Sequence, residues 1–192
     1  MRKLIAAFNM SLDGFCDHTE MIADDEILQH YNDLLSSAGT ILYGRITYQL
    51  MESYWPTLVK DPSGNKTADE FAVLLDNLFK VVFSHTLKDD DPTITGWKNS
   101  RLTKKDLKEE VEELRESRNG GSKYILAGSR SLIVALLNLN LIDEFQICVQ
   151  PTILGKGLPL LENIVDRIDL KLRKTKIFRS GVITHYYEPV KK

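Results

Sequence analysis

The sequence predicts an α/β fold built on one mostly parallel sheet with an antiparallel edge. Short apolar runs alternate with segments of helical periodicity along most of the 192 residues, an order typical of parallel strands joined by crossover helices. The last segment, from Leu170 to Val190, instead alternates like a hairpin around Arg179, Ser180 and Gly181, which predicts an antiparallel pair. A chain of this length is expected to form a single domain over residues 1–192.

The expected strands each end in a polar or glycine-containing turn. They cover residues 3–10, 40–43, 80–83, 124–126 and 145–149. The spacing of apolar residues predicts helices over 24–37, 47–54, 68–78 and 131–139. A further helix opens at Thr103-x-x-Asp106, which resembles a capping box, and ends at Asn119-Gly120-Gly121. The second helix is expected to stop before Pro56, because the residue before a proline disfavours helical backbone.

Composition excludes several kinds of partner. The formal charge of −2 and the isoelectric point near 6.1 provide no basic surface for nucleic acid or for an anionic membrane. Cys16 and Cys148 have neither a paired spacing nor a nearby histidine cluster, so we expect no metal site and no disulfide framework, and Cys148 fits a buried strand. The apolar run near the N-terminus is too short and too often interrupted by polar residues to be a signal peptide. We therefore expect a cytoplasmic protein that binds a small-molecule substrate.

Three turns after expected strands carry glycine, hydroxyl or cationic residues. They are Gly44-Arg45-Ile46-Thr47, Ser84-His85-Thr86 and Gly128-Ser129-Arg130. The carboxyl ends of parallel strands share one edge of a sheet, where ligands bind. Free backbone N–H groups at helix starts and the planar donors of arginine both suit phosphate oxygens. Together the turns predict a ligand with several phosphates, although each alone also fits packing and solubility, and the usual GxGxxG fingerprint is absent.

Four segments in a fixed order make the chain resemble a known family. They are AAFNMSLDG at residues 6–14, GRITY at 44–48 followed by Tyr54-Trp55-Pro56, FSHTL at 83–87, and LIDEF with a later P-x-x-LGxG at 141–157. This order resembles the dihydrofolate-reductase-like superfamily, and most closely the C-terminal reductase domain of the bifunctional riboflavin-biosynthesis deaminase-reductase. The resemblance covers nearly the whole chain.

This resemblance implies a three-layer α/β/α, dihydrofolate-reductase-like domain, usually a homodimer, that binds NADPH and reduces a heterocycle or an imine-like sugar intermediate. It places Arg45, Ser84 and His85 at the adenosine 2′-phosphate. The pyrophosphate would meet the turn of Gly44 and Thr47 and the backbone N–H groups of Ala127, Gly128, Ser129 and Arg130. His85 stands where the family pattern has arginine, and histidine carries less positive charge at neutral pH. The choice between NADPH and NADH is therefore open.

The substrate end of the pocket has several candidate residues, each with a structural alternative. By the resemblance, Asp13 lies at the nicotinamide, where a carboxyl is a general acid or orients the substrate; it equally fits an Asx-type turn before Gly14. Trp55 suits a flat, pterin-like ring or a core position. Gly155 and Lys156 form a substrate-lining loop or a tight turn. Asp24 and Asp25 are better explained as helix caps than as pocket carboxylates.

The sequence thus predicts an NADPH-dependent reductase that transfers hydride to a small heterocyclic substrate related to pterins, pyrimidines or flavins. Met51-Glu52-Ser53 replaces the element that helps the riboflavin reductases hold the ribitol phosphate, so the substrate is open. One alternative is the riboflavin-pathway 5-amino-6-(5-phosphoribosylamino)uracil reductase itself. The other is a non-catalytic dimer that binds a nucleotide or another ligand.

Overall fold

The computed structural model describes residues 1–117 and 124–191, and a mixed β-sheet runs through its centre. The strands with parallel neighbours are β1 (Lys3–Ser11), β2 (Ala38–Gly44), β3 (Phe79–Phe83), β4 (Ser100–Thr103), β5 (Tyr124–Ala127) and β6 (Glu144–Gln150). A C-terminal hairpin follows, made of β7 (Leu170–Ile177) and β8 (Ile183–Pro189). The helices are α1 (Asp25–Ser36), α2 (Arg45–Lys60), α3 (Lys66–Asn77), α4 (Pro92–Gly96), α5 (Leu107–Glu116) and α6 (Arg130–Asn138), with a short 3-10 turn η1 (His18–Glu20).

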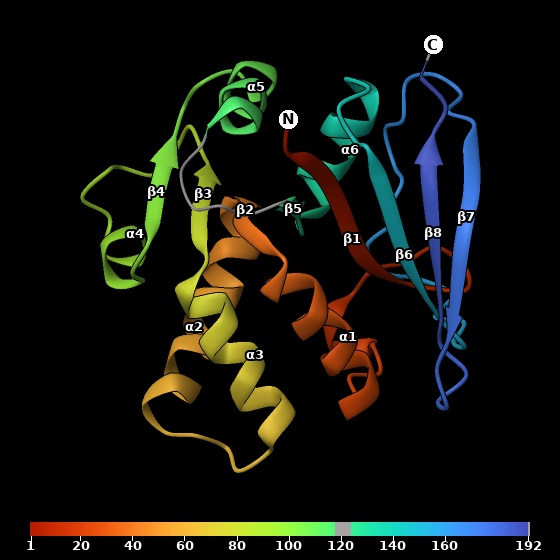
Figure 1. The fold of residues 1–192 in the computed structure, drawn as a ribbon, viewed down its shortest axis with the longest axis horizontal. Coiled ribbons are helices and arrows are strands. Elements are labelled where there is room, and N and C mark those ends of the chain that lie inside the picture. The colour runs from red at the N-terminus through yellow and green to blue at the C-terminus, as the bar shows by residue number, and fades with distance from the viewer. Residues whose placement is uncertain (118–123, 192) are drawn as a thin grey trace.

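The described residues form one sheet of eight strands in the order β4-β3-β2-β5-β1-β6-β8-β7, which Figure 1 shows from left to right. Neighbouring strands from β4 to β6 are parallel. β8 is antiparallel to β6, and β7 is antiparallel to β8. The predicted fold class, a mostly parallel sheet with an antiparallel C-terminal hairpin, is confirmed.

Helices cover both faces of the sheet because successive residues of a strand point to opposite sides. Leu4 and Ala6 of β1 belong to a buried cluster that includes residues of α5 and α6. Ile5, between them, belongs to a second cluster with residues of α1, α2 and α3. The continuous apolar runs of the central strands follow from burial on both faces. This arrangement is the predicted three-layer α/β/α architecture.

The hairpin is held to the rest of the fold by a small cluster beside α1. Ile27 of α1, Cys148 of β6, and Phe178 and Val182 of the hairpin pack together. Cys148 is 1% exposed, so the predicted buried position of this thiol is confirmed. Among the described residues, no three histidine, cysteine, aspartate or glutamate side chains are grouped as a metal site would need. No helix within the same residues has the length and apolar character of a membrane span.

Helix α2 continues through Pro56 to Lys60, so the prediction that it stops before the proline was wrong. Packing against α3 explains the difference, because the ring of Trp55 lies 4.4 Å from that of Phe71, between ring centroids. A proline inside a helix removes one backbone hydrogen bond. In α2 the tertiary contacts outweigh that loss.

The segment before α5 also differs from the prediction. Thr103 ends β4, a strand that the sequence pattern missed because it is short and half polar. Asp106 is the N-cap of α5 and accepts hydrogen bonds from the N–H groups of Lys108 and Glu109. The capping box expected to begin at Thr103 is therefore wrong, and the helix starts later. The expected end at Asn119-Gly120-Gly121 lies outside the described residues.

Replacing Pro56 measures the local cost that the proline imposes on α2, which tertiary packing has to outweigh. We expect Pro56→Ala to raise the free energy of unfolding by about 1–3 kcal/mol, because alanine restores the missing N–H and removes the ring clash. The larger conformational freedom of the unfolded chain offsets part of this gain. Urea denaturation measures the change, with Ser53→Ala on the same helix as a control expected to change it by less than about 0.5 kcal/mol. A destabilised Pro56→Ala variant would contradict this account.

Candidate functional site

A groove of about 350 Å³ lies at the carboxyl ends of β2 and β3, beside the start of α6. It is lined by Gly44, Arg45, Ile46, Thr47, Phe83, Ser84, His85, Thr86, Ser131 and Leu132. Two turns that lie 40 residues apart in the sequence thus meet at one edge of the sheet, as expected for parallel neighbours. The lining includes the cation Arg45, and none of the described lining residues is acidic. The charge of the lining therefore favours an anion.

The starts of α2 and α6 meet beside the groove. Gly44 is the N-cap of α2 and Ser129 that of α6, and among the described residues no side chain caps either helix. The N–H of Gly44 instead donates to the Ser129 hydroxyl at 2.9 Å. A Cβ at Gly44 would lie 3.3 Å from the Ser131 hydroxyl, so glycine permits this close approach. The free N–H groups and positive dipole ends of both helices form a site suited to phosphate.

Polar side chains in the groove lining come from the first turn of α2 and from the turn after β3. Arg45 is exposed, and its Nη1 donates to Oε1 of Gln49, one turn further along the helix, at 3.3 Å. The Ser84 hydroxyl accepts hydrogen bonds from the N–H groups of Thr86 and Leu87. Ser84 therefore shapes the turn that exposes His85. Arg45 and His85 both line the groove.

The turn after β5 lies beside the groove, and its arginine side chain is engaged elsewhere. The Nε of Arg130 donates to the carbonyl of Pro159 at 2.6 Å, and its Nη2 pairs with Glu162 at 2.7 Å. Ala127 and Gly128 lead into the N-cap of α6, next to the groove but outside its lining. The sequence prediction had assigned backbone N–H groups to this turn, and the structure places that turn at the start of α6.

One half of β1 has an open edge in the middle of the sheet. β1 pairs with β5 over Lys3–Ala6 but with β6 over Ile5–Ser11. In the described part of the chain, residues 7–10 therefore have no strand partner on the β5 side. Leu4 is fully buried, whereas residues 7–10 are half-buried. Three strand spacings of about 4.8 Å, roughly 14 Å, separate β3 from β1, so an extended ligand held at the groove can reach this edge.

The carboxylate of Asp13 fastens two loops together beside the open edge. It accepts hydrogen bonds from the Ser11 hydroxyl at 2.6 Å, from the N–H of Leu154 at 3.1 Å and from the N–H of Gly155 at 2.7 Å. These bonds, that from Ser11 foremost, lower the pKa of Asp13 to about 2. The carboxylate is therefore ionised at neutral pH and carries no proton to donate. Its geometry fits an anchor for residues 154–155 better than a general acid.

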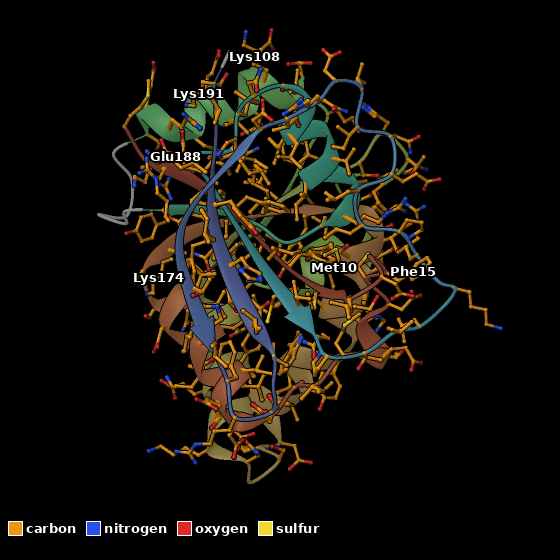
Figure 2. The ribbon with its side chains drawn as sticks, turned by 90° about the vertical axis from the view of Figure 1, so that its right-hand side faces the viewer. Met10, Phe15, Lys108, Lys174, Glu188 and Lys191 are labelled. Carbon is orange, nitrogen blue, oxygen red and sulfur yellow. The ribbon has the colours of Figure 1, made fainter. Side chains whose placement is uncertain are left out.

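Asp17 joins the loop after β1 to residues 157–158, a few residues beyond the contacts of Asp13. Its Oδ2 accepts from the N–H of Leu158 at 2.7 Å. A Cβ at Gly157 would lie only 2.2 Å from that oxygen, and Gly157 has φ +144°, so this position requires glycine. Figure 2 shows Met10 and Phe15 near the carboxyl end of β6. The segment that contains residues 154–158 follows that end of the strand.

The remaining predicted residues do not gather at the groove. Lys156 and Gly155 are exposed in the anchored loop, and Trp55 packs against Phe71 in the layer of α1–α3. Asp24 accepts from the N–H of Ile27 at 2.9 Å and is a helix cap, as the sequence favoured. Ser131, which lines the groove, was not predicted as a site residue. Its position directly after the Gly128-Ser129-Arg130 turn, in the first turn of α6, is a signal that could have identified it.

A comparison with protein families agrees with this architecture. The family model described as the RibD C-terminal domain matches residues 2–185. The chain belongs to the RibD C-terminal domain family. This confirms the resemblance seen in the sequence motifs.

Individual relatives and solved structures match nearly the whole chain. The Bacillus subtilis (strain 168) protein YyaP is 33% identical over 189 residues, which cover 97% of this chain and 94% of YyaP. A Shewanella sp. PV-4 protein assigned provisionally to riboflavin biosynthesis superposes with a TM-score of 0.71 at 18% identity, covering 98% and 99% of the two chains. The Thermotoga maritima diaminohydroxyphosphoribosylaminopyrimidine deaminase/5-amino-6-(5-phosphoribosylamino)uracil reductase superposes with a TM-score of 0.65 at 16% identity, covering 98% of this chain and 57% of that one.

The low pKa of Asp13 gives a test of its anchoring role. Its carboxylate stabilises the folded state fully above the unfolded pKa of about 3.9, and this stabilisation is lost as the pH falls towards the folded value of about 2. We expect wild type to have a higher melting temperature than Asp13→Asn above pH 5, and the difference to shrink between pH 4 and pH 2. Thermal unfolding followed by circular dichroism measures it. Asp61→Asn, at the exposed end of α2, is the control, and a difference independent of pH would contradict the anchor.

Proposed function

We propose that this protein is an NADPH-dependent reductase that transfers a hydride to a small heterocyclic substrate related to pterins, pyrimidines or flavins. The observation that carries the proposal is the meeting of two uncapped helix starts and Arg45 at one groove. Membership of the RibD C-terminal domain family supports the oxidoreductase class. The cofactor supplies the hydride, and the protein supplies binding and orientation.

The groove fits the phosphates of a dinucleotide. Arg45, with Ser84 and His85, would hold the 2′-phosphate, because a doubly charged group needs a cation as well as hydroxyl donors. The N–H groups at the starts of α2 and α6 would hold the pyrophosphate. The nicotinamide ring would then lie at the open edge of β1, where its carboxamide meets unpaired backbone groups. The loop anchored by Asp13 would border the same position.

A second candidate is the 5-amino-6-(5-phosphoribosylamino)uracil reductase step of the riboflavin pathway, which the family match favours. Complementation of a strain that lacks this reductase distinguishes it from the broader proposal. Growth would identify that pyrimidine as the substrate. Failure to grow, with the protein expressed and folded, would exclude it.

The first experiment is a nucleotide titration. NADPH quenches tryptophan emission by energy transfer, and Trp55 and Trp97 both lie in the same layer as α2. We expect saturable quenching by NADPH at sub-millimolar concentration and weaker binding of NADH. If neither nucleotide bound in this range, the reductase proposal would fail, and a non-catalytic role with another ligand would take its place.

Arg45 is expected to distinguish the two nucleotides. Arg45→Ala should weaken NADPH binding by about tenfold or more, because a charge-assisted hydrogen bond is lost, and should change NADH binding by less than about threefold. Lys60→Ala is the matched control, since it removes a cation from the far end of the same helix, roughly 22 Å away. An equal loss for both nucleotides would mean that Arg45 does not contact the 2′-phosphate.

We also propose that the protein is a homodimer whose contact includes β7. This strand forms one edge of the sheet in the described residues, and Leu170, Leu172 and Ile177 are exposed along it. Lys174 marks this strand in Figure 2. Exposed apolar side chains along this strand favour contact with another chain through side chains, whereas the four cations among its eight residues disfavour direct strand pairing. Light scattering should give twice the monomer mass for wild type and for the control Val73→Glu, and a smaller mass for Leu172→Glu. A monomeric wild type would refute the proposal.

A further inference from the structure

Strand β4 ends directly beside the turn that carries His85. In the parallel ladder of β3 and β4, Phe83 is the register partner of Thr103, and the N–H of Ser84 donates to the carbonyl of Thr103 at 3.3 Å. The segments that follow these two strands therefore leave the sheet side by side, about 4.8 Å apart. The residue after Thr103 is Lys104, so its backbone lies about one strand spacing from the turn.

Strand alternation places Lys104 on the α2 side of this edge. Phe83 packs on the buried cluster that contains residues of α5, and the Thr103 hydroxyl donates to Oε2 of Glu110, also in α5, at 2.7 Å. Both side chains therefore point to the α5 face. Because successive residues of a strand point to opposite faces, the next residue, Lys104, is directed to the face covered by α2, which begins at Arg45.

The other cations of β4 and of the turn after it are paired with α5. Nη1 of Arg101 donates to Oε2 of Glu110 at 3.2 Å, and Nζ of Lys105 donates to the two carboxylate oxygens of Glu113 at 2.8 and 2.6 Å. Lys104 is exposed and, within the described residues, makes no hydrogen bond or ion pair. Its ammonium group is a point charge on a long flexible stem, and it is available to a ligand at this edge.

The groove needs more positive charge than its lining supplies. Arg45 is the one permanent cation among the described lining residues. His85 also lines the groove, but histidine carries less positive charge than lysine at neutral pH and above. Asp89 and Asp90, further along the same turn, are exposed and lie outside the lining. A phosphate with two negative charges is bound best where cations converge on it, and Lys104 supplies a second one.

We propose that Lys104 is a further cofactor-specificity residue, whose ammonium group binds the 2′-phosphate of NADPH from the β4 side of the groove. This assignment rests on the proposed reductase function and adds a residue to its cofactor site. Arg45 and Lys104 would hold the phosphate between them, at the turn of Ser84 and His85. NADH has a free 2′-hydroxyl there and offers Lys104 no anion, so the lysine favours NADPH.

Two nucleotides that lack the nicotinamide test the assignment directly. Adenosine 2′,5′-bisphosphate carries the 2′-phosphate and adenosine 5′-monophosphate does not, and calorimetry at pH 8 measures the binding of each. We expect Lys104→Gln to weaken binding of the bisphosphate by about three- to tenfold, because an ion pair at a partly exposed site is lost. Binding of the monophosphate should change by less than about twofold. Lys104→Arg keeps the cation and should bind the bisphosphate within about twofold of wild type.

Lys105→Gln is the matched control for a contact as opposed to a general field. It removes the same charge one residue further along, from a side chain held by Glu113. We expect it to weaken binding of the bisphosphate by less than about twofold, since solvent and salt screen a charge that does not touch the ligand. Equal weakening by Lys104→Gln and Lys105→Gln would overturn the assignment. Thermal unfolding of each variant checks that the fold is intact.

Titration with NADPH and NADH separates this assignment from the proposed function. Lys104→Gln should lower the ratio of NADPH affinity to NADH affinity by the same three- to tenfold. If wild type binds NADPH and Lys104→Gln binds it equally well, the assignment to Lys104 is overturned and the reductase proposal stands. If wild type binds neither NADPH nor NADH, the proposed function fails and the assignment fails with it.

Discussion

The site depends on the close approach of two helix starts. β2 and β5 are neighbours in the sheet, so the helices that follow them begin side by side, and the hydrogen bond from Gly44 to Ser129 fixes their separation. Each start carries a partial positive charge. Two like charges at this distance raise the free energy of the unliganded protein, and an anion between them lowers it. The sheet order, Gly44 and the positive potential at this edge are therefore aspects of one constraint.

The fold was predictable because its signals are local. Apolar runs for strands and apolar spacing for helices both follow from burial on the two faces of the sheet, and parallel topology then brings Gly44 and Ser84 to one edge. Local signals failed where tertiary contacts determine the secondary structure. Helix α2 passes Pro56 because Trp55 packs on Phe71. The four residues of β4 are half polar, and Arg101 and Thr103 within it both bond to the buried carboxylate of Glu110 in α5.

The candidate site likewise has a part that the sequence predicts and a part that it does not. The turn residues were found from the sequence because strand ends are readable there, and the groove contains Gly44, Arg45, Thr47, Ser84 and His85. The role of Asp13 was not readable, since its partners Leu154 and Gly155 are more than 140 residues away. The open edge was also hidden, because it arises from the difference in length between β1 and β5, and the sequence does not show which strands are neighbours.

Because β1 is longer than β5, the open edge and the groove are built from different parts of the chain. The groove is built from residues 44–47, 83–86 and 131–132, whereas the open half of β1 and Tyr31 of α1, which donates to Asn9 within it, lie within the first 31 residues. Substitutions in this N-terminal stretch can therefore change the open edge without altering the lining of the groove. The groove can in this way be inherited unchanged while the open edge diverges, so that related chains can share one scaffold and differ in one part of it.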